Sequence, residues 1–312
     1  MDTTIVLRCA GERTEALSRR LLVSESDASC VVPIHEKPFA HAVRRTLEIG
    51  HAEGRPWTLA ADADVLVREG SVGALVAVAE RMPEDVFRVE GRVFDKLFHG
   101  YRPAGFHLYR TSLLGEALRH LSETPVHRPE HHVARSMEAR GFGNRYVDVR
   151  VGIHDYEQYL RDLYRKGFVH AQKHTRYLRF LEPLWNRLAR EDIDFRLVLC
   201  GMEDGLRHGG VAVTDTRFFE RISADAVEKI AGQEREPLRA DGLETSDVSE
   251  RMAGLREAPE YRRWKKRRAR KRKRKNRPPH LKDRVAASIA APVRSVFRWL
   301  APRPGARDTT KR

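Results

Sequence analysis

Two aspartates one residue apart, Asp62 and Asp64, are the residues of this sequence whose type and spacing most directly suggest chemistry. They follow a short apolar run over residues 57–61, in which Trp and Thr favour a β-strand. A strand that ends in two carboxylates places oxygen ligands at the sheet edge where open α/β folds bind their ligands. Such oxygens suit Mg²⁺ or Mn²⁺ bound to the phosphates of a nucleotide. The alternative is a solvated turn between a strand and a helix.

Strand and helix signals alternate through the half of the chain that contains these aspartates. The alternation predicts an α/β fold with a doubly wound, mostly parallel sheet. Strands are expected over 4–9, 30–34, 57–61, 86–89, 106–110 and 146–151, and helices over 12–22, 39–51, 72–81, 113–121 and 130–140.

Beyond residue 155 the pattern becomes helical. A long amphipathic stretch over 156–190 predicts a helix, a run over 195–200 a possible strand, and residues 224–231 a further helix. The sequence turns polar after Gln233. We therefore predict four parts: an α/β domain (1–155), a mainly helical C-terminal extension (156–232), a linker (233–260) and a polybasic, amphipathic tail (261–312).

The positive charge of the protein belongs to this basic tail. The whole chain carries 59 Lys/Arg and 44 Asp/Glu, a formal net charge of +15. Residues 261–312 hold 21 of the basic and two of the acidic residues, so residues 1–260 hold 38 and 42 and carry −4. The body that bears the aspartates is therefore slightly acidic.

Cysteine usage and the N-terminus indicate the compartment. The three cysteines, Cys9, Cys30 and Cys200, include no close pair, which excludes a disulfide scaffold or a Cys-x-x-Cys zinc site and fits a reducing cytoplasm. The first residues show no basic segment followed by an apolar core, so no signal peptide is expected.

An ordered series of motifs surrounds the two aspartates. A helix ends over 48–54 before the strand with Asp62 and Asp64, and the segment 104–110 follows. Glu130 then opens a helix that ends over 140–142, and His154 follows a strand over 146–151. In this order, residues 40–155 resemble the nucleotide-sugar glycosyltransferases of the GT-A fold, especially the inverting, family-2-like kind. The resemblance implies that residues 1–155 form a nucleotide-sugar-binding catalytic domain.

The resemblance also implies roles for the acidic residues. Asp64 would hold Mn²⁺ or Mg²⁺, Asp62 would hold the ribose or a metal-bound water, and His154 would complete the metal shell or bind a phosphate. Glu130 would be the catalytic base for the acceptor hydroxyl, because the family has an acidic pair at such a helix start. Glu130 also suits a helix N-terminus, and His154 a helix cap.

Three further residues are candidate donor-binding groups. Glu36 is the one acidic residue after the second strand, where the family binds uracil and ribose with an acidic pair. His107 and Arg110 would bind the diphosphate, or are ordinary strand residues. The implied function is that of a metal-dependent, hexosyltransferase-like glycosyltransferase, which moves a sugar from a nucleotide-sugar donor to a glycan or lipid-linked acceptor. A nucleotidyltransferase that uses the same carboxylates is a weaker alternative.

The basic tail suggests the location of the protein. Residues 262–277 are nearly all Lys/Arg, and residues 281–300 can form an amphipathic helix, which Pro292 and its charges make unsuited to span a bilayer. A polybasic block beside such a helix is typical of an anchor on an anionic membrane. We therefore expect a cytoplasmic protein, peripheral at the inner face of the cell membrane. The alternative is a nucleic-acid-binding protein that acts through this tail.

Overall fold

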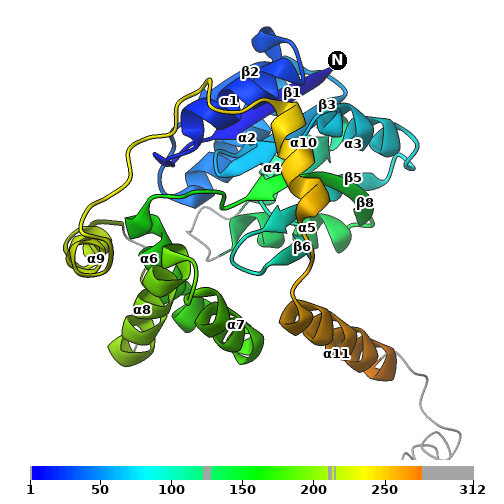
Figure 1. Cartoon of the computed structure of the whole chain (residues 1–312). Helices are drawn as coiled ribbons and strands as arrows, with labels where there is room; N and C mark the ends of the chain where they lie inside the picture. Colours follow the sequence, from blue (N-terminus) through cyan, green and yellow to red (C-terminus); the bar gives the residue numbers. More distant parts are fainter. Residues whose placement is uncertain (1, 122–127, 210–212, 214–215, 276–312) are drawn as a thin grey trace, which may run out of the picture. The chain divides into compact units, whose positions relative to one another are not determined.

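The computed structural model describes residues 2–121, 128–209, 213 and 216–275 (Figure 1). Its contacts divide the chain into two compact units, 1–263 and 264–312. The first unit contains the sheet and every candidate site residue. The second is described only over 264–275, where it forms the later part of helix α11 (Pro259–Lys275).

An eight-stranded mixed sheet forms the centre of the first unit, in the order β2-β1-β3-β7-β5-β8-β4, with β6 paired to β5. Strands β1, β2, β3, β5 and β8 run in one direction and β4, β6 and β7 in the other. The predicted α/β class with a mostly parallel sheet is therefore confirmed. The strands are β1 (Thr3–Arg8), β2 (Val31–Ile34), β3 (Trp57–Asp62), β4 (Val65–Val67), β5 (Val86–Asp95), β6 (Gly100–Arg102), β7 (Phe106–Arg110) and β8 (Gly143–His154).

Helices cover both faces of this sheet. Leu17 and Leu21 of α1 (Glu15–Ser24) share a core cluster with Ile5 of β1, whereas Ala42 of α2 (Phe39–Glu53) packs with Val6, the next residue of the same strand. Because side chains alternate along a strand, α1 and α2 lie on opposite faces. The chain therefore winds in two directions from β1, and the carboxyl ends of β1 and β3 form the switch point where such sheets bind ligands. The other helices near the sheet are α3 (Ser71–Glu80), α4 (Leu114–Arg119) and α5 (Pro129–Glu138), with 3₁₀ turns at Ala28–Cys30 and Thr111–Leu113.

The predicted helical extension is present, but its elements differ from the prediction in two places. The stretch over 156–190 forms two helices, α6 (Leu160–Lys173) and α7 (Thr175–Leu188), which meet at His174. The strand predicted over 195–200 is wrong, because these residues belong to α8 (Ile193–His208). Asp192 caps that helix by accepting a hydrogen bond from the Asp194 amide at 2.9 Å. A short apolar run fits a strand and a buried helix equally well, and here the cap and the helical partner decide.

Glycines allow α6 and α8 to cross in backbone contact. A Cβ atom on Gly167 of α6 would lie 2.0 Å from the carbonyl oxygen of Val198, and one on Gly201 would lie 1.9 Å from that of Tyr164. Any side chain at either position would force the helices apart. Together with α9 (Thr216–Ala231), these helices form the group seen in green and yellow in Figure 1. The close crossing fixes α6, which carries a lysine of the candidate site.

The chain returns to the sheet after this helical group. Helix α10 (Thr245–Gly254) lies within the segment predicted as a linker, and its Val248 and Met252 are buried in the main core cluster. No helix in the described parts of the chain combines the length and apolarity needed to cross a membrane. The amphipathic helix predicted over 281–300 lies outside the described residues.

Candidate functional site

The turn between β3 and β4 holds the two aspartates in fixed directions. The Ala63 amide donates to the carbonyl of Arg8 at 3.0 Å, and the Ala63 carbonyl accepts from the hydroxyl of Thr14 at 2.7 Å. The Asp64 carbonyl accepts from the Asp155 amide at 3.0 Å. The turn is thus bound to the end of β1, the start of α1 and the end of β8. The alternative of a solvated turn does not hold at Asp64, which is only 8% exposed.

Asp64 belongs to a cluster of charged groups at the carboxyl ends of β5 and β8, which we call the Asp64 cluster. His154 Nε2 lies 3.4 Å from Asp64 Oδ1, while its Nδ1 lies 3.2 Å from both Asp95 and Asp155. Lys166 of α6 donates to Asp64 Oδ2 at 2.9 Å and contacts Asp155. The members come from the β3–β4 turn, the ends of two strands and the helical extension.

The charges of this cluster are mutually stabilised. Burial would lower the pKa of His154, but Asp155 and Asp64 raise it well above the ordinary value. A metal ion bound through His154 would therefore have to replace a proton on the ring. The pKa of Lys166 is raised in the same way, since both carboxylates outweigh its burial. Despite burial, His154 and Lys166 hold the pKa of Asp155 far below its usual range. Asp155 itself has a left-handed backbone with φ of 63°, which is uncommon outside glycine.

The Asp64 cluster has donors suited to a divalent cation. Asp64, His154 and Asp155 each offer one ligand atom, and these atoms all lie within 4.8 Å of one another. Asp64 Oδ1 is buried and has no hydrogen-bond partner among the described residues. Adjacent ligands of an octahedral ion lie about 3 Å apart, which is close to the 3.4 Å between this oxygen and His154 Nε2. The residues present therefore fit Mn²⁺ or Mg²⁺, with Lys166 on the other oxygen of Asp64.

Asp62 lies in a different network, which we call the Asp62 cluster. Arg8, only 4% exposed, pairs with Asp62 at 2.7 Å and with Glu130 at the start of α5. His107 of β7 links Glu130, at 3.2 Å, to Glu90 of β5, at 2.7 Å. Arg88 completes the cluster through Glu90 at 3.0 Å. The contacts thus join Asp62, His107 and Glu130 in one network and Asp64, His154 and Asp155 in another.

The electrostatics of the Asp62 cluster bear on the predicted base. Burial would raise the pKa of Glu130, but Arg8 and His107 hold it well below its ordinary value. Burial would lower the pKa of His107, yet Glu130 and Glu90 raise it to about 9. Burial raises the pKa of Asp62 despite its pairing with Arg8. A carboxylate held ionised by two cations is a weak proton acceptor, so the cluster favours a structural role for Glu130.

Glu12 is a carboxylate near the aspartates that the sequence analysis missed. It lies in the loop between β1 and α1, and its side chain accepts from the Ala10 amide at 2.7 Å. Burial raises its pKa to about 7, and the nearby charges of Asp64 and Asp62 add to the increase. A carboxyl group that titrates near neutrality can accept a proton during catalysis. Its position after the first strand was the only available signal in the sequence.

The structure places two of the predicted binding residues away from these clusters. Arg110 lies opposite Trp57, at the end of β3 remote from Asp62. Its guanidinium stacks 4.6 Å from the Trp57 ring and donates to the carbonyls of Met82, at 3.1 Å, and Val86, at 3.1 Å. These contacts stabilise the edge of the sheet opposite the two charged clusters. Glu36 is exposed in the loop after β2.

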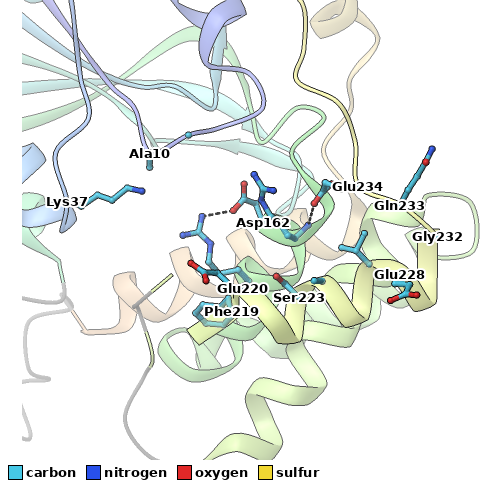
Figure 2. Close-up of a pocket in the computed structure, with 15 residues that line it drawn as sticks. Ala10, Lys37, Asp162, Phe219, Glu220, Ser223, Glu228, Gly232, Gln233 and Glu234 are labelled. Carbon is cyan, nitrogen blue, oxygen red and sulfur yellow. Dashed lines mark hydrogen bonds and ion pairs between the residues drawn. The ribbon is translucent and has the colours of Figure 1, made fainter. Parts of the chain in front are cut away.

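A cavity of about 680 Å³ opens beside the carboxyl ends of β1 and β2 (Figure 2). Ala10 and Lys37 reach it from the loops after these strands, while Phe219 and Ser223 come from α9. Its size is within the range of pockets that bind small ligands. Its charged lining includes Lys37, Arg161, Asp162, Arg165, Glu220, Glu228 and Glu234.

Helix α6 joins this cavity to the Asp64 cluster. Asp162 and Arg165 line the cavity and form an ion pair at 3.0 Å, and Lys166 contacts Asp64. Residues 162 and 166 are one helical turn apart and therefore lie on the same face of α6. No short-range pattern could have predicted the role of Lys166, which is separated from Asp64 by 102 residues.

Comparisons with known proteins find similarity in the folded structure only. No family model matches this chain, and no curated protein does. A glycosyltransferase involved in the glycosylation of the major capsid of PBCV-1 is similar with a TM-score of 0.33 and 15% identity, over 47% of this chain and 80% of its own.

Two further similar structures are transferases. Glucosyl-3-phosphoglycerate synthase from Mycobacterium tuberculosis, in complex with Mn²⁺ and uridine-diphosphate-glucose, has a TM-score of 0.36 and 12% identity, over 50% of this chain and 71% of its own. A cytidylyltransferase from Leptospira borgpetersenii has a TM-score of 0.35 and 12% identity, over 47% and 76%. At these scores the likeness carries no argument about the chemistry of this chain.

Proposed function

We propose that this protein is a divalent-cation-dependent glycosyltransferase that transfers a sugar from a nucleotide-sugar donor to a glycan or lipid-linked acceptor with inversion. One observation carries the proposal. Helix α6 links the Asp64, His154 and Asp155 donors to the cavity of about 680 Å³ at the carboxyl edge of the sheet, because its Lys166 contacts Asp64 and its preceding turn lines the cavity. This edge is where doubly wound sheets bind nucleotides.

The cavity supplies groups for the donor. Lys37, Arg161 and Arg165 offer positive charge for a diphosphate, and the ring of Phe219 offers an apolar surface. Asp64 and His154 would hold Mn²⁺ or Mg²⁺, which neutralises the charge that develops on a diphosphate leaving group. Lys166 bridges Asp64 and Asp155, and so keeps both carboxylates oriented toward the proposed metal position.

Proton transfer from the acceptor hydroxyl is assigned to Glu12 in this proposal. Arg8 and His107 keep Glu130 ionised and hydrogen-bonded, which leaves it little basicity. Glu12, with its pKa raised to about 7, is closer to the operating range of a general base. Glu130 then serves to fix Arg8 beside Asp62.

Nucleotide binding with and without metal tests the proposed function. Calorimetric titration of the full chain with UDP, GDP, ADP and CDP should show one nucleotide whose affinity rises about tenfold or more when Mn²⁺ replaces EDTA. Release of the same nucleoside diphosphate from its sugar conjugate should then be measurable. Binding of none of these nucleotides in Mn²⁺ or Mg²⁺ would contradict the proposal. Release of pyrophosphate from a nucleoside triphosphate would instead indicate a nucleotidyltransferase.

The basic tail is proposed to hold the enzyme on an anionic membrane. Full-length protein should float with vesicles that contain phosphatidylserine and should be released by raised salt, because exposed charges are then screened. The matched truncation should remove residues 264–312 only, since Tyr261 is buried and donates to the Tyr101 carbonyl at 2.8 Å. Flotation that persists after truncation, or tail-dependent binding to nucleic acid without vesicle binding, would refute the anchor.

A further inference from the structure

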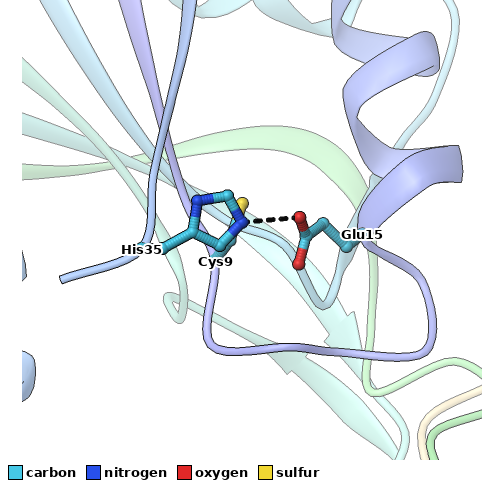
Figure 3. A group of neighbouring side chains, drawn as sticks. All are labelled: Cys9, Glu15 and His35. Carbon is cyan, nitrogen blue, oxygen red and sulfur yellow. Dashed lines mark hydrogen bonds and ion pairs between the residues drawn. The ribbon is translucent and has the colours of Figure 1, made fainter. Parts of the chain in front are cut away.

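A second group of potential metal ligands lies at the carboxyl edge of the sheet, outside both charged clusters. Cys9, Glu15 and His35 each offer one donor atom, and the three atoms lie within 4.8 Å of one another (Figure 3). They belong to three different segments, namely the residue after β1, the first residue of α1 and the residue after β2. None of them contributes to the Asp64 or Asp62 cluster.

Strand register brings the cysteine and the histidine together. β1 and β2 are parallel, and their last paired residues are Arg8 and Ile34. Cys9 and His35 are the next residues of the two strands, and the Cys9 amide donates to the Ile34 carbonyl at 2.8 Å. Residues in register on parallel strands point to the same face. The arrangement is therefore built into the sheet.

Helix α1 brings the carboxylate to the same point. Glu15 Oε1 lies 2.8 Å from His35 Nε2, and Figure 3 shows the imidazole and the carboxylate facing each other beside the Cys9 sulfur. All three residues line a separate cavity of about 310 Å³. The sulfur end is deep, because Cys9 is 3% exposed, whereas the side chain of His35 is 62% exposed. An ion and water can therefore enter from the histidine side.

The donor types select among metals. Thiolate and imidazole favour Zn²⁺ over Mg²⁺ or Mn²⁺, which prefer oxygen ligands. Three protein ligands with one open position are the usual arrangement of a reactive rather than a purely structural zinc site. Binding would replace the thiol proton of Cys9 with the metal and release that proton to solvent. The Asp64 cluster has no thiolate, and its two carboxylates also suit Mg²⁺ and Mn²⁺.

We propose that Cys9, Glu15 and His35 bind one Zn²⁺ and leave a fourth position for water or a ligand. The ion would tie the end of β1 to the loop that carries Lys37, two residues after His35, which lines the larger cavity. Zinc at this point therefore fixes one wall of that cavity. Zinc binding at this site does not depend on the proposed glycosyltransferase activity.

Cobalt spectroscopy and zinc calorimetry on the full chain test the site. In calorimetric titration of the metal-free protein, one Zn²⁺ should bind at a site that depends on Cys9 and His35, and Co²⁺ should give a thiolate-to-metal charge-transfer band, which requires a cysteine ligand. Cys9→Ser should abolish the band, and His35→Ala should weaken Zn²⁺ binding about tenfold to a hundredfold. Because His35 is exposed, its variant should fold normally, which keeps the test valid if Cys9→Ser is unstable.

Two control variants locate the metal. Cys30→Ser removes another buried cysteine, and Asp64→Asn disables the oxygen-rich cluster. Both should keep the Co²⁺ band and the Zn²⁺ affinity of the unmodified chain. Absence of Zn²⁺ binding to the unmodified protein would overturn the proposal. A band that survives Cys9→Ser, or an affinity unchanged in His35→Ala, would also overturn it.

Discussion

Asp64→Asn is expected to abolish the metal-dependent part of nucleotide binding and to lower turnover at least about a hundredfold. The change keeps the size of the side chain but removes its negative charge. It also replaces the pair of carboxylate oxygens that face His154, at 3.4 Å, and Lys166, at 2.9 Å. Calorimetric titration with the preferred nucleoside diphosphate, in Mn²⁺ and in EDTA, measures the first effect. Nucleotide release from the sugar donor measures the second.

Control variants separate metal binding from proton transfer and from general charge loss. Asp148→Asn removes an exposed carboxylate on β8 that pairs with Arg92, and it should change neither quantity. Glu12→Gln should keep metal-dependent nucleotide binding and lose turnover, as expected of a proton acceptor. Unchanged affinity and turnover in correctly folded Asp64→Asn would exclude the proposed metal role of this residue.

Arg8→Met is expected to lower the free energy of unfolding by about 3–5 kcal/mol, the usual cost of removing one partner from a buried ion pair. The guanidinium lies between Asp62 and Glu130, and the substitution leaves both carboxylates in the interior without this cation. Urea denaturation followed by circular dichroism measures the change, with the slope m expected to stay constant. The matched control is Arg92→Met, in an exposed pair with Asp148, which should cost less than about 1 kcal/mol.

The pH dependence of the Arg8→Met effect gives an independent check. The folded-state pKa of Glu130 is well below its ordinary value of 4.5, so its pairing stabilises the protein above pH 4.5 and is lost as the pH falls toward the folded-state pKa. The stability difference between the two proteins should therefore shrink in acid. A difference below about 1 kcal/mol at neutral pH, or one that grows in acid, would contradict the assigned role of Arg8.

Local sequence patterns predicted much of the frame of this site. The alternating apolar runs placed β1, β2, β3 and their helices, because strand and helix periodicities are short-range properties of the chain. The grouping of Asp64, after β3, with His154, after β8, came from the family resemblance rather than from a local pattern, because β7 and β5 lie between these two strands in the sheet. Their atoms lie 3.4 Å apart.

Other assignments depended on partners that no local pattern reveals. The local sequence of 195–200 fits a strand, but this segment is helical, and its helix packs closely against α6 at Gly167 and Gly201. Arg110 belongs to the segment that was predicted to line the donor site. The register of β7 against β3 instead places it beside Trp57, at the edge of the sheet opposite Asp62. Antiparallel pairing reverses the direction of β7, so its carboxyl end, which carries Arg110, lies at the edge opposite the carboxyl end of β3.

By itself, the sequence determined the α/β class, the strand that ends in Asp62 and Asp64, and the slightly acidic body with its basic tail. Only the tertiary structure decided that the two aspartates belong to different clusters. Arg8 comes from 54 positions before Asp62, and Lys166 from 102 positions after Asp64. Buried carboxylates must be paired with cations, and the cations nearest in space need not be near in sequence. The fold therefore decided which cations pair with each aspartate, and it placed Asp64 beside the His154 and Asp155 donors.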